Sequence, residues 1–176
     1  MSIRRVVTGH SADGRAVFVS DAEVHPFEPT LMAGAAFYSL WGADDAAVYP
    51  DDGSRPETPQ YFPGLGGFRF DTFVIPPVNA AAPMPLDPAA AVAEFEEHLP
   101  GLMSYMEPDD PGMHTTDTTD FEIVLSGQVI LELDNGAEVT LSAGDTVVQN
   151  GTRHRWRNPG DLPAVIAVFM VGAHPR

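Results

Sequence analysis

The sequence predicts an all-β protein, an antiparallel sandwich or barrel with one short helix and proline-rich loops. Three observations point to this class. Short segments rich in Val, Phe and Tyr recur roughly every eight to twelve residues between turn signals. An Asn-Gly pair at 135–136 is typical of a tight hairpin. A single segment carries both the caps and the apolar spacing of a helix.

The first part of the chain, residues 1–43, is expected to form N-terminal strands. Strand patterns cover Arg15–Ser20 and Ala35–Trp41, and a further one covers Gly67–Ile75. In that last segment aromatic residues alternate with charged ones, as in a strand with one face buried.

The middle of the chain, residues 44–111, is expected to be a loop-rich acidic excursion. It holds 13 acidic residues and 2 arginines, a net charge of −11. Proline and glycine concentrate in the runs 49–59 and 76–88, which predict stiff loops. A helix is predicted near 88–98, because Asp87 is a good N-cap, proline takes the first helical position and Pro-Gly follows the last turn.

The last third of the chain has the most regular strand pattern. Glycines and the Asn-Gly turn separate its segments, as in an antiparallel meander. The predicted strands are Phe121–Leu125, Val129–Leu133, Glu138–Leu141, Thr146–Gln149, His154–Arg157 and Ala164–Val171.

The composition excludes several kinds of chemistry. The 9 cationic residues are all arginine and there is no cysteine, so a Schiff-base lysine, a nucleophilic thiol, a disulfide and a cysteine zinc site are ruled out. A net charge of −16 argues against nucleic acid and anionic membrane surfaces as partners. No long apolar run predicts a membrane span or a signal peptide, and a cytoplasmic location is expected.

Two stretches, Gly112–Gly127 and Gly144–Asn158, resemble the two sequence motifs of the cupin superfamily. His114 stands where the first motif has its first histidine, and Asp120 stands at the place of the motif glutamate. In the second stretch, Gly-x-x-His ends at His154 with the spacing of the second motif. The chain is therefore similar to the small single-domain cupins of the type-2 conserved-barrel kind.

This resemblance implies a jelly roll, or double-stranded β-helix, with residues 1–176 as one cupin domain and 112–176 as its core. It implies a divalent metal ion held by His114, Asp120 and His154. Two imidazoles and one carboxylate suit iron(II) best, while manganese, nickel and zinc are alternatives. The resemblance also implies a homodimer that packs or exchanges N-terminal strands.

The match departs from the family pattern at the second histidine of the first motif, which is replaced by Thr116. Thr116 is expected to occupy the vacated ligand position, directly or through water. We expect it to line the substrate pocket together with Trp156 and Asn158, although Trp156 also suits simple packing in the barrel mouth.

Strand alternation adds a further candidate. If Asp120 points into the barrel, so does Glu122, and a buried carboxylate needs a partner, a metal or a proton. Glu122 is therefore a candidate catalytic acid or base, or an exposed carboxylate if a bulge shifts the register. The same alternation places the arginines at 153, 155 and 157 on an outer face, paired with acids or with a second subunit.

The resemblance implies a metal-dependent enzyme that acts on a small organic metabolite. The favoured reaction is oxygenase-type chemistry on an aromatic or enolisable substrate. Metal-assisted lyase, isomerase or cyclase chemistry using Glu122 is the alternative. A metal-free cupin that only binds a small molecule is the competing class, because one motif histidine is missing.

Overall fold

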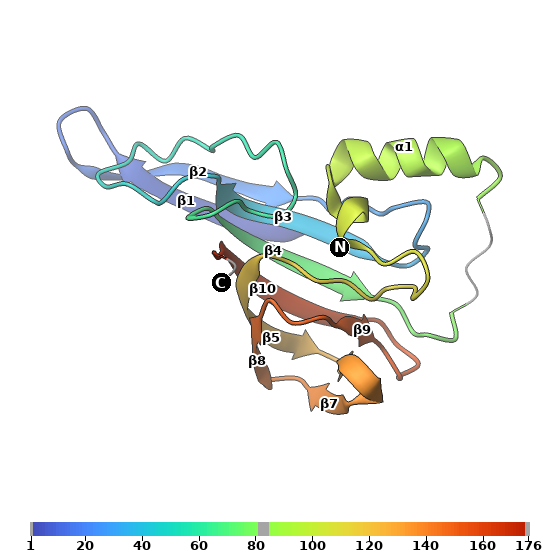
Figure 1. Cartoon of the computed structure of the whole chain (residues 1–176). Helices are drawn as coiled ribbons and strands as arrows, with labels where there is room; N and C mark the ends of the chain where they lie inside the picture. The colour runs from blue at the N-terminus through green and yellow to red at the C-terminus, as the bar shows by residue number, and fades with distance from the viewer. Residues whose placement is uncertain (1, 81–84, 175–176) are drawn as a thin grey trace.

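A computed structural model describes residues 2–80 and 85–174 of the chain (Figure 1). Part of the predicted proline-rich stretch 76–88, residues 81–84, lies outside the described residues. The fold is mostly β, as the strand patterns predict, with one α-helix among the described elements.

The largest layer is a five-stranded antiparallel sheet in the order β3-β4-β10-β5-β8. All five strands were predicted, with ends that differ by a few residues. Their bounds are β3 Ala36–Ala43, β4 Phe68–Ile75, β10 Ala164–Gly172, β5 Thr118–Ser126 and β8 Thr146–Asn150.

A three-stranded sheet, β7-β6-β9, packs against one end of the large sheet. It comprises β6 (Gln128–Glu132), β7 (Glu138–Ser142) and β9 (Arg155–Arg157). The core between the two sheets includes Val129 from the small sheet and Ile166 from the large one, which are 0% and 1% exposed. Two facing sheets joined by an apolar core are the arrangement of a jelly roll.

The predicted Asn-Gly hairpin is confirmed between β6 and β7. The connection is a short 3-10 turn, Asp134–Gly136, in which Asn135 and Gly136 adopt φ values of 58° and 70°. Asparagine and glycine tolerate this left-handed backbone better than other residues.

An N-terminal hairpin of β1 (Ile3–His10) and β2 (Ala16–Val24) lies on the outer face of the large sheet. Its Ile3 and Val24 pack on the buried side chains of β3. The β2 pattern was predicted from Arg15 onward. The β1 segment was expected only as part of the N-terminal strand region, because two adjacent arginines interrupt its apolar alternation.

The predicted helix is confirmed as α1, Pro88–His98. The Asp87 side chain accepts a hydrogen bond from the Ala90 N–H at 3.0 Å, which is the expected N-cap. With the 3-10 helix Leu102–Tyr105, α1 covers the inner face of the large sheet that the small sheet leaves free. Phe95 of α1, 1% exposed, packs there with Met170 of β10.

Strand β4 turns its charged residues inward. Arg69 and Asp71 are each 2% exposed, whereas the intervening Phe70 is 43% exposed on the outer face. Arg69 donates to backbone carbonyls and to the Asp44 carboxylate at 2.5 Å, so its charge is well compensated. The alternation in the sequence predicts only that the aromatic and the charged residues of β4 lie on opposite faces. The packing of the sheet decides that the charged residues are inside.

In the part of the chain that the structure describes, no helix is both long and apolar enough to cross a membrane.

Candidate functional site

The candidate site is built around two histidines that the fold brings together from distant parts of the chain. His114 lies in the loop before β5 and His154 lies just before β9, and each backbone N–H donates to the carbonyl of the other at 2.9 Å. Their ring centroids are 4.2 Å apart. Both were predicted as metal ligands, and the structure places them side by side.

The second ring nitrogen of each histidine is free to bind a ligand. The Nδ1 of His114 lies 3.1 Å from the Gly112 carbonyl, and that of His154 lies 2.9 Å from the Thr152 carbonyl. A carbonyl accepts, so the proton sits on Nδ1 and Nε2 keeps its lone pair. Burial lowers the pKa of both rings, to about 4 for His154, whose pKa the neighbouring His114 lowers further. Both rings are therefore neutral at pH 7, the state a metal ion requires.

Two carboxylates on β5 face the barrel interior, as strand alternation predicts. Asp120 is 5% exposed and Glu122 is 7% exposed. Burial raises the pKa of Asp120 to about 6, although a hydrogen bond from Thr118 opposes the shift. Burial and the nearby Asp120 charge raise the pKa of Glu122 to about 8. Among the described residues, Asp120 Oδ1 and Glu122 Oε2 have no hydrogen-bond partner.

Thr116, which replaces the second motif histidine, is buried next to this group. Its hydroxyl lies 2.8 Å from that of Thr118, which in turn hydrogen-bonds Asp120. Gln149, opposite Asp120 on β8, donates to the Thr152 carbonyl at 3.1 Å and so supports the loop that precedes His154. A relay of short polar side chains therefore connects the Thr116 position to the Asp120 carboxylate.

Trp156 and Asn158 hold the second motif in place. Trp156 is half-buried and packs on the core between the two sheets. Asn158 is 0% exposed, donates to the Ile75 and Leu162 carbonyls at 2.9 and 2.8 Å, and accepts from the Gly160 N–H at 2.8 Å. These contacts account for the amide of Asn158. A part for either residue in a substrate pocket stays a prediction.

The structure adds two interior groups that sequence reasoning missed. Asp71 of β4 pairs across the sheet with Val168, which pairs on its other side with Glu122, so both carboxylates lie in one inward row. Burial raises the pKa of Asp71 to about 7, with hydrogen bonds from Leu40 and Ser39 opposing it. Among the described residues, Asp71 Oδ1 and the buried Tyr61 hydroxyl lack partners.

A signal for Asp71 exists in the sequence. It is the only acidic residue within the β4 strand pattern, and it lies two residues from Arg69, so the two side chains share one face of the strand. Tyr61 lies in an irregular segment and has no such signal.

The chemistry of these donors suits a divalent ion. Two neutral imidazoles with free Nε2 atoms and a buried carboxylate with an orphaned oxygen are the ligand chemistry of such an ion. In the described part of the chain no three His, Asp or Glu side chains already lie close enough to hold one. His114 and His154 form a close pair, and Asp120 as a third ligand stays a prediction.

The arginine stripe beside the site forms an outer, ion-paired face, as predicted. Arg155 donates to Glu132 at 2.7 and 2.8 Å and to Asp110 at 2.8 Å. Arg153 bridges Glu107, Asp110 and Asp134, and Arg157 contacts Glu132 and Glu138. These pairs attach the loop before His114 to the strands that carry His154.

Comparison with known families settles the identity of this region. The family model for the cupin domain matches residues 101–171, which include both histidines and both β5 carboxylates. Residues 101–171 form a cupin domain. The assignment of the whole chain, residues 1–176, to a single cupin domain stays a prediction.

The chain is similar to a biosynthesis cluster protein and to two cupin-domain-containing oxidoreductases. Oryzines biosynthesis cluster protein J of Aspergillus oryzae is 34% identical over 83 residues, covering 47% of this chain and 42% of that protein. The cupin-domain-containing oxidoreductase fogC of Aspergillus ruber is 26% identical over 162 residues, covering 90% of this chain and 67% of that protein. The cupin-domain-containing oxidoreductase virC of Hypocrea virens is 25% identical over 178 residues, covering 97% and 76%. The match thus spans less than half of the oryzines protein.

Among solved structures, the Cupin 2 conserved barrel domain protein of Salinispora arenicola is 20% identical, with a TM-score of 0.38 over 59% of this chain and 62% of that one.

Proposed function

We propose that this cupin is a metal-dependent enzyme that acts on a small organic metabolite by oxygenase-type chemistry on an aromatic or enolisable substrate. The observation that carries the proposal is the His114–His154 pair, whose Nε2 atoms are free and whose rings are neutral. The two relatives named as cupin-domain oxidoreductases, which align along most of the chain, support it.

His114 and His154 would hold the ion, with Asp120 as the third ligand and Thr116 beside the position of the missing histidine. Iron(II) suits this donor set best, and manganese, nickel and zinc are the alternatives. Such an ion supplies open coordination positions for substrate and dioxygen. The protein contributes a buried interior, which excludes water, and the pairing that fixes both imidazoles before the ion arrives.

The test is metal analysis followed by oxygen consumption. Protein purified without chelator, then reconstituted anaerobically with iron(II), is expected to hold about one ion per chain by elemental analysis. Aromatic and enolisable compounds are then screened with an oxygen electrode. A chain that stays metal-free after reconstitution contradicts the proposal and favours a cupin that only binds a small molecule.

A second candidate, metal-assisted lyase, isomerase or cyclase chemistry, is favoured by Glu122. Among the described residues its Oε2 is buried without a partner, and burial raises its pKa to about 8, so the side chain holds a proton at pH 7 that it could transfer. Substrate turnover without oxygen uptake selects this candidate. A Glu122→Gln variant that keeps both its metal and its full turnover removes Glu122 from the chemistry.

A homodimer is proposed as the working form. An outward row runs in register across three strands, Phe169 of β10, Phe121 of β5 and Val148 of β8, which are 40%, 50% and 59% exposed. The row is uncharged in a chain of net charge −16, so like-charge repulsion between two copies is weakest there. Light scattering is expected to report a dimer that Phe121→Asp weakens and Val48→Asp, in an exposed loop, leaves unchanged.

A further inference from the structure

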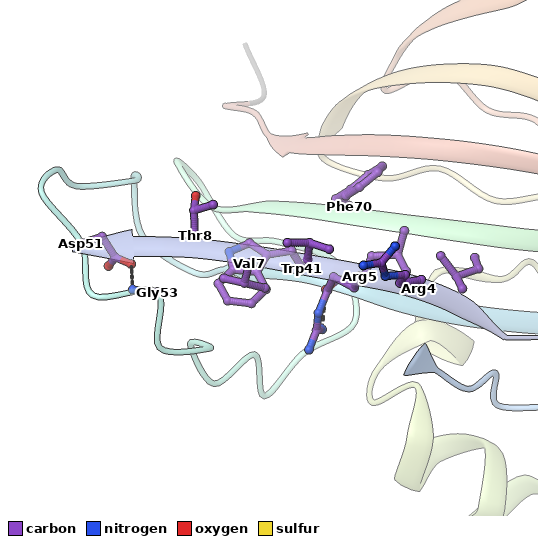
Figure 2. A pocket seen from close by; sticks show the side chains of 11 residues that line it. Arg4, Arg5, Val7, Thr8, Trp41, Asp51, Gly53 and Phe70 are labelled. Atoms are coloured by element: carbon purple, nitrogen blue, oxygen red, sulfur yellow. Dashed lines mark hydrogen bonds between the residues drawn. The ribbon is translucent and has the colours of Figure 1, made fainter. Parts of the chain in front are cut away.

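A groove lies between the N-terminal hairpin and the outer face of the large sheet. It has a volume of about 550 Å³. One wall is β1 from Ile3 to Thr8, another is formed by Trp41 and Phe70, and the acidic loop supplies Asp51 and Gly53 (Figure 2). Three segments far apart in the sequence therefore enclose one groove.

Arg5 dominates one end of this groove. Its guanidinium lies 5.4 Å from the centroid of the Trp41 ring, a cation–π contact, and its Nη1 donates to the Leu40 carbonyl at 2.7 Å. Arg5 Nε is shielded from water and, among the described residues, has no acceptor. A planar guanidinium fixed at one nitrogen and stacked on a ring is held ready for a bidentate acceptor.

Arg5 also differs from most arginines of this chain in having no carboxylate partner. Six arginines have an acidic oxygen within ion-pair distance: Arg4, Arg15, Arg69, Arg153, Arg155 and Arg157. Within residues 2–80 and 85–174, Arg5 and Arg55 form no such pair. The chain has 25 acidic residues, yet none of the described ones pairs with Arg5 at this end of the groove.

Arg55 lies close to Arg5. It donates to the Ser39 carbonyl at 3.2 Å, one residue from the carbonyl that holds Arg5. Burial lowers the pKa of Arg55, and the positive charge of Arg5 lowers it further, while Asp71 opposes this. Among the described residues neither arginine forms an ion pair, so the two cations repel each other, and an anion bound at Arg5 reduces that repulsion.

The opposite end of the groove disfavours a second negative charge. Asp51 lies there, with its carboxylate accepting from the Gly53 N–H at 2.7 Å (Figure 2). Arg4 also lines the groove, but its charge is paired with Asp21 at 2.6 Å. The rest of the lining is mostly apolar and includes Trp41 and Phe70. The groove therefore offers a cation for one acidic group and rings for an apolar body, and it repels a dianion.

We propose that this groove binds a small organic monocarboxylate with an aromatic body, its carboxylate on Arg5 and its ring against Trp41 and Phe70. The site is separate from the histidine pair, because Phe70 points to the outer face of β4 whereas its neighbour Asp71 points into the barrel. Binding therefore needs no metal and goes beyond the proposed enzymatic function.

The test uses phenylacetate as the probe and the uncharged phenylacetamide as its control. The chain has 2 tryptophans, so two indole N–H signals are expected in an NMR spectrum of the full metal-free protein, assigned with Trp41→Phe. Phenylacetate is expected to shift the Trp41 signal and leave that of Trp156 in place. Phenylacetamide is expected to bind about tenfold more weakly, because it lacks the charge-assisted hydrogen bonds.

Matched variants locate the contact. Arg5→Gln is expected to raise the Kd for phenylacetate about tenfold or more, while Arg15→Gln, whose exposed arginine pairs with Asp13 away from the groove lining, leaves it within about twofold. If Arg5→Gln lowers the melting temperature, Arg55→Gln replaces it as the test variant. Arg55→Gln is expected to raise the Kd for phenylacetate several-fold.

Other results would overturn the proposal. Equal binding of phenylacetate and phenylacetamide means an apolar groove only. Equal shifts with inorganic phosphate mean an unspecific anion site. A Trp41 signal that changes with protein concentration but not with phenylacetate means that a second copy covers the groove.

Discussion

His114 and His154 face each other across two reciprocal backbone hydrogen bonds of 2.9 Å, with ring centroids 4.2 Å apart. The pairing depends on main-chain contacts between two segments that are distant in sequence. It therefore does not depend on a bound ion.

The first prediction concerns metal content. His114→Ala and His154→Ala should each lower the affinity for iron(II) by about a hundredfold or more, because each removes one Nε2 donor. Elemental analysis after dialysis against buffer measures the retained ion. His25→Ala, which removes an exposed histidine, should retain the wild-type amount. Equal loss in all three variants would indicate unspecific surface binding.

The second prediction concerns pH and stability. The pKa of Glu122 rises from its ordinary value of 4.5 to about 8 on folding, and that of Asp71 from 3.8 to about 7. Above about pH 4.5 the unfolded chain has released these protons, whereas the folded chain holds that of Asp71 up to about pH 7 and that of Glu122 up to about pH 8, so stability falls as pH rises. Without metal, the free energy of unfolding should drop by about 2 kcal/mol between about pH 6.5 and 8.5.

Glu122→Gln should remove most of that slope, because the amide does not titrate. Urea titrations at several pH values measure it, and Glu97→Gln on the exposed side of α1 serves as control. An unchanged slope in Glu122→Gln would show that the carboxyl is solvated rather than buried.

The third prediction concerns the arginine stripe. Glu132 is 7% exposed and is held by Arg155 and Arg157. Arg155→Met should lower the free energy of unfolding, because it leaves the Glu132 carboxylate short of a partner. Arg15→Met, which removes an exposed pair with Asp13, should change it by less than about 0.5 kcal/mol. If both substitutions lower the free energy of unfolding equally, the Arg155–Glu132 pair contributes no more than an exposed ion pair does.

The fourth prediction separates packing from pocket at Asn158. Asn158→Ala should cost about 2 to 4 kcal/mol of stability, because two buried carbonyls and one N–H lose their partner. Calorimetry measures the loss. Metal affinity is expected to stay within about threefold of wild type, and a change in substrate KM without a change in stability would instead assign Asn158 to the pocket.

The prediction of the fold from the sequence was good where local signals and burial agree. The helix from Pro88 has its cap, its proline and its stop in consecutive residues, and Asn135 and Gly136 carry the hairpin turn in their own backbone preferences. Strand β1 was not predicted individually, because Arg4 and Arg5 mask its pattern. Arg5 adopts its place only through contact with Trp41 and Leu40, which belong to another strand.

For the site, parity along β5 was enough to predict that Asp120 and Glu122 share the inner face. It did not predict that Asp71, from a strand far away in sequence, joins their row, because cross-strand register depends on β10 lying between them. Tyr61, in a loop without periodicity, left no pattern to read. Its hydroxyl is interior because the loop packs against α1 and β10.

By itself, the sequence determined the all-β class, the cupin resemblance of the last third and the chemical repertoire. A chain without lysine or cysteine can offer only histidine, carboxylate and hydroxyl groups to a reaction. Tertiary structure alone decided that two imidazoles meet, that three carboxyls share a buried interior, and that Arg5 has no acidic partner among the described residues. These outcomes depend on distances between segments remote in sequence, and desolvation and charge pairing act through those distances.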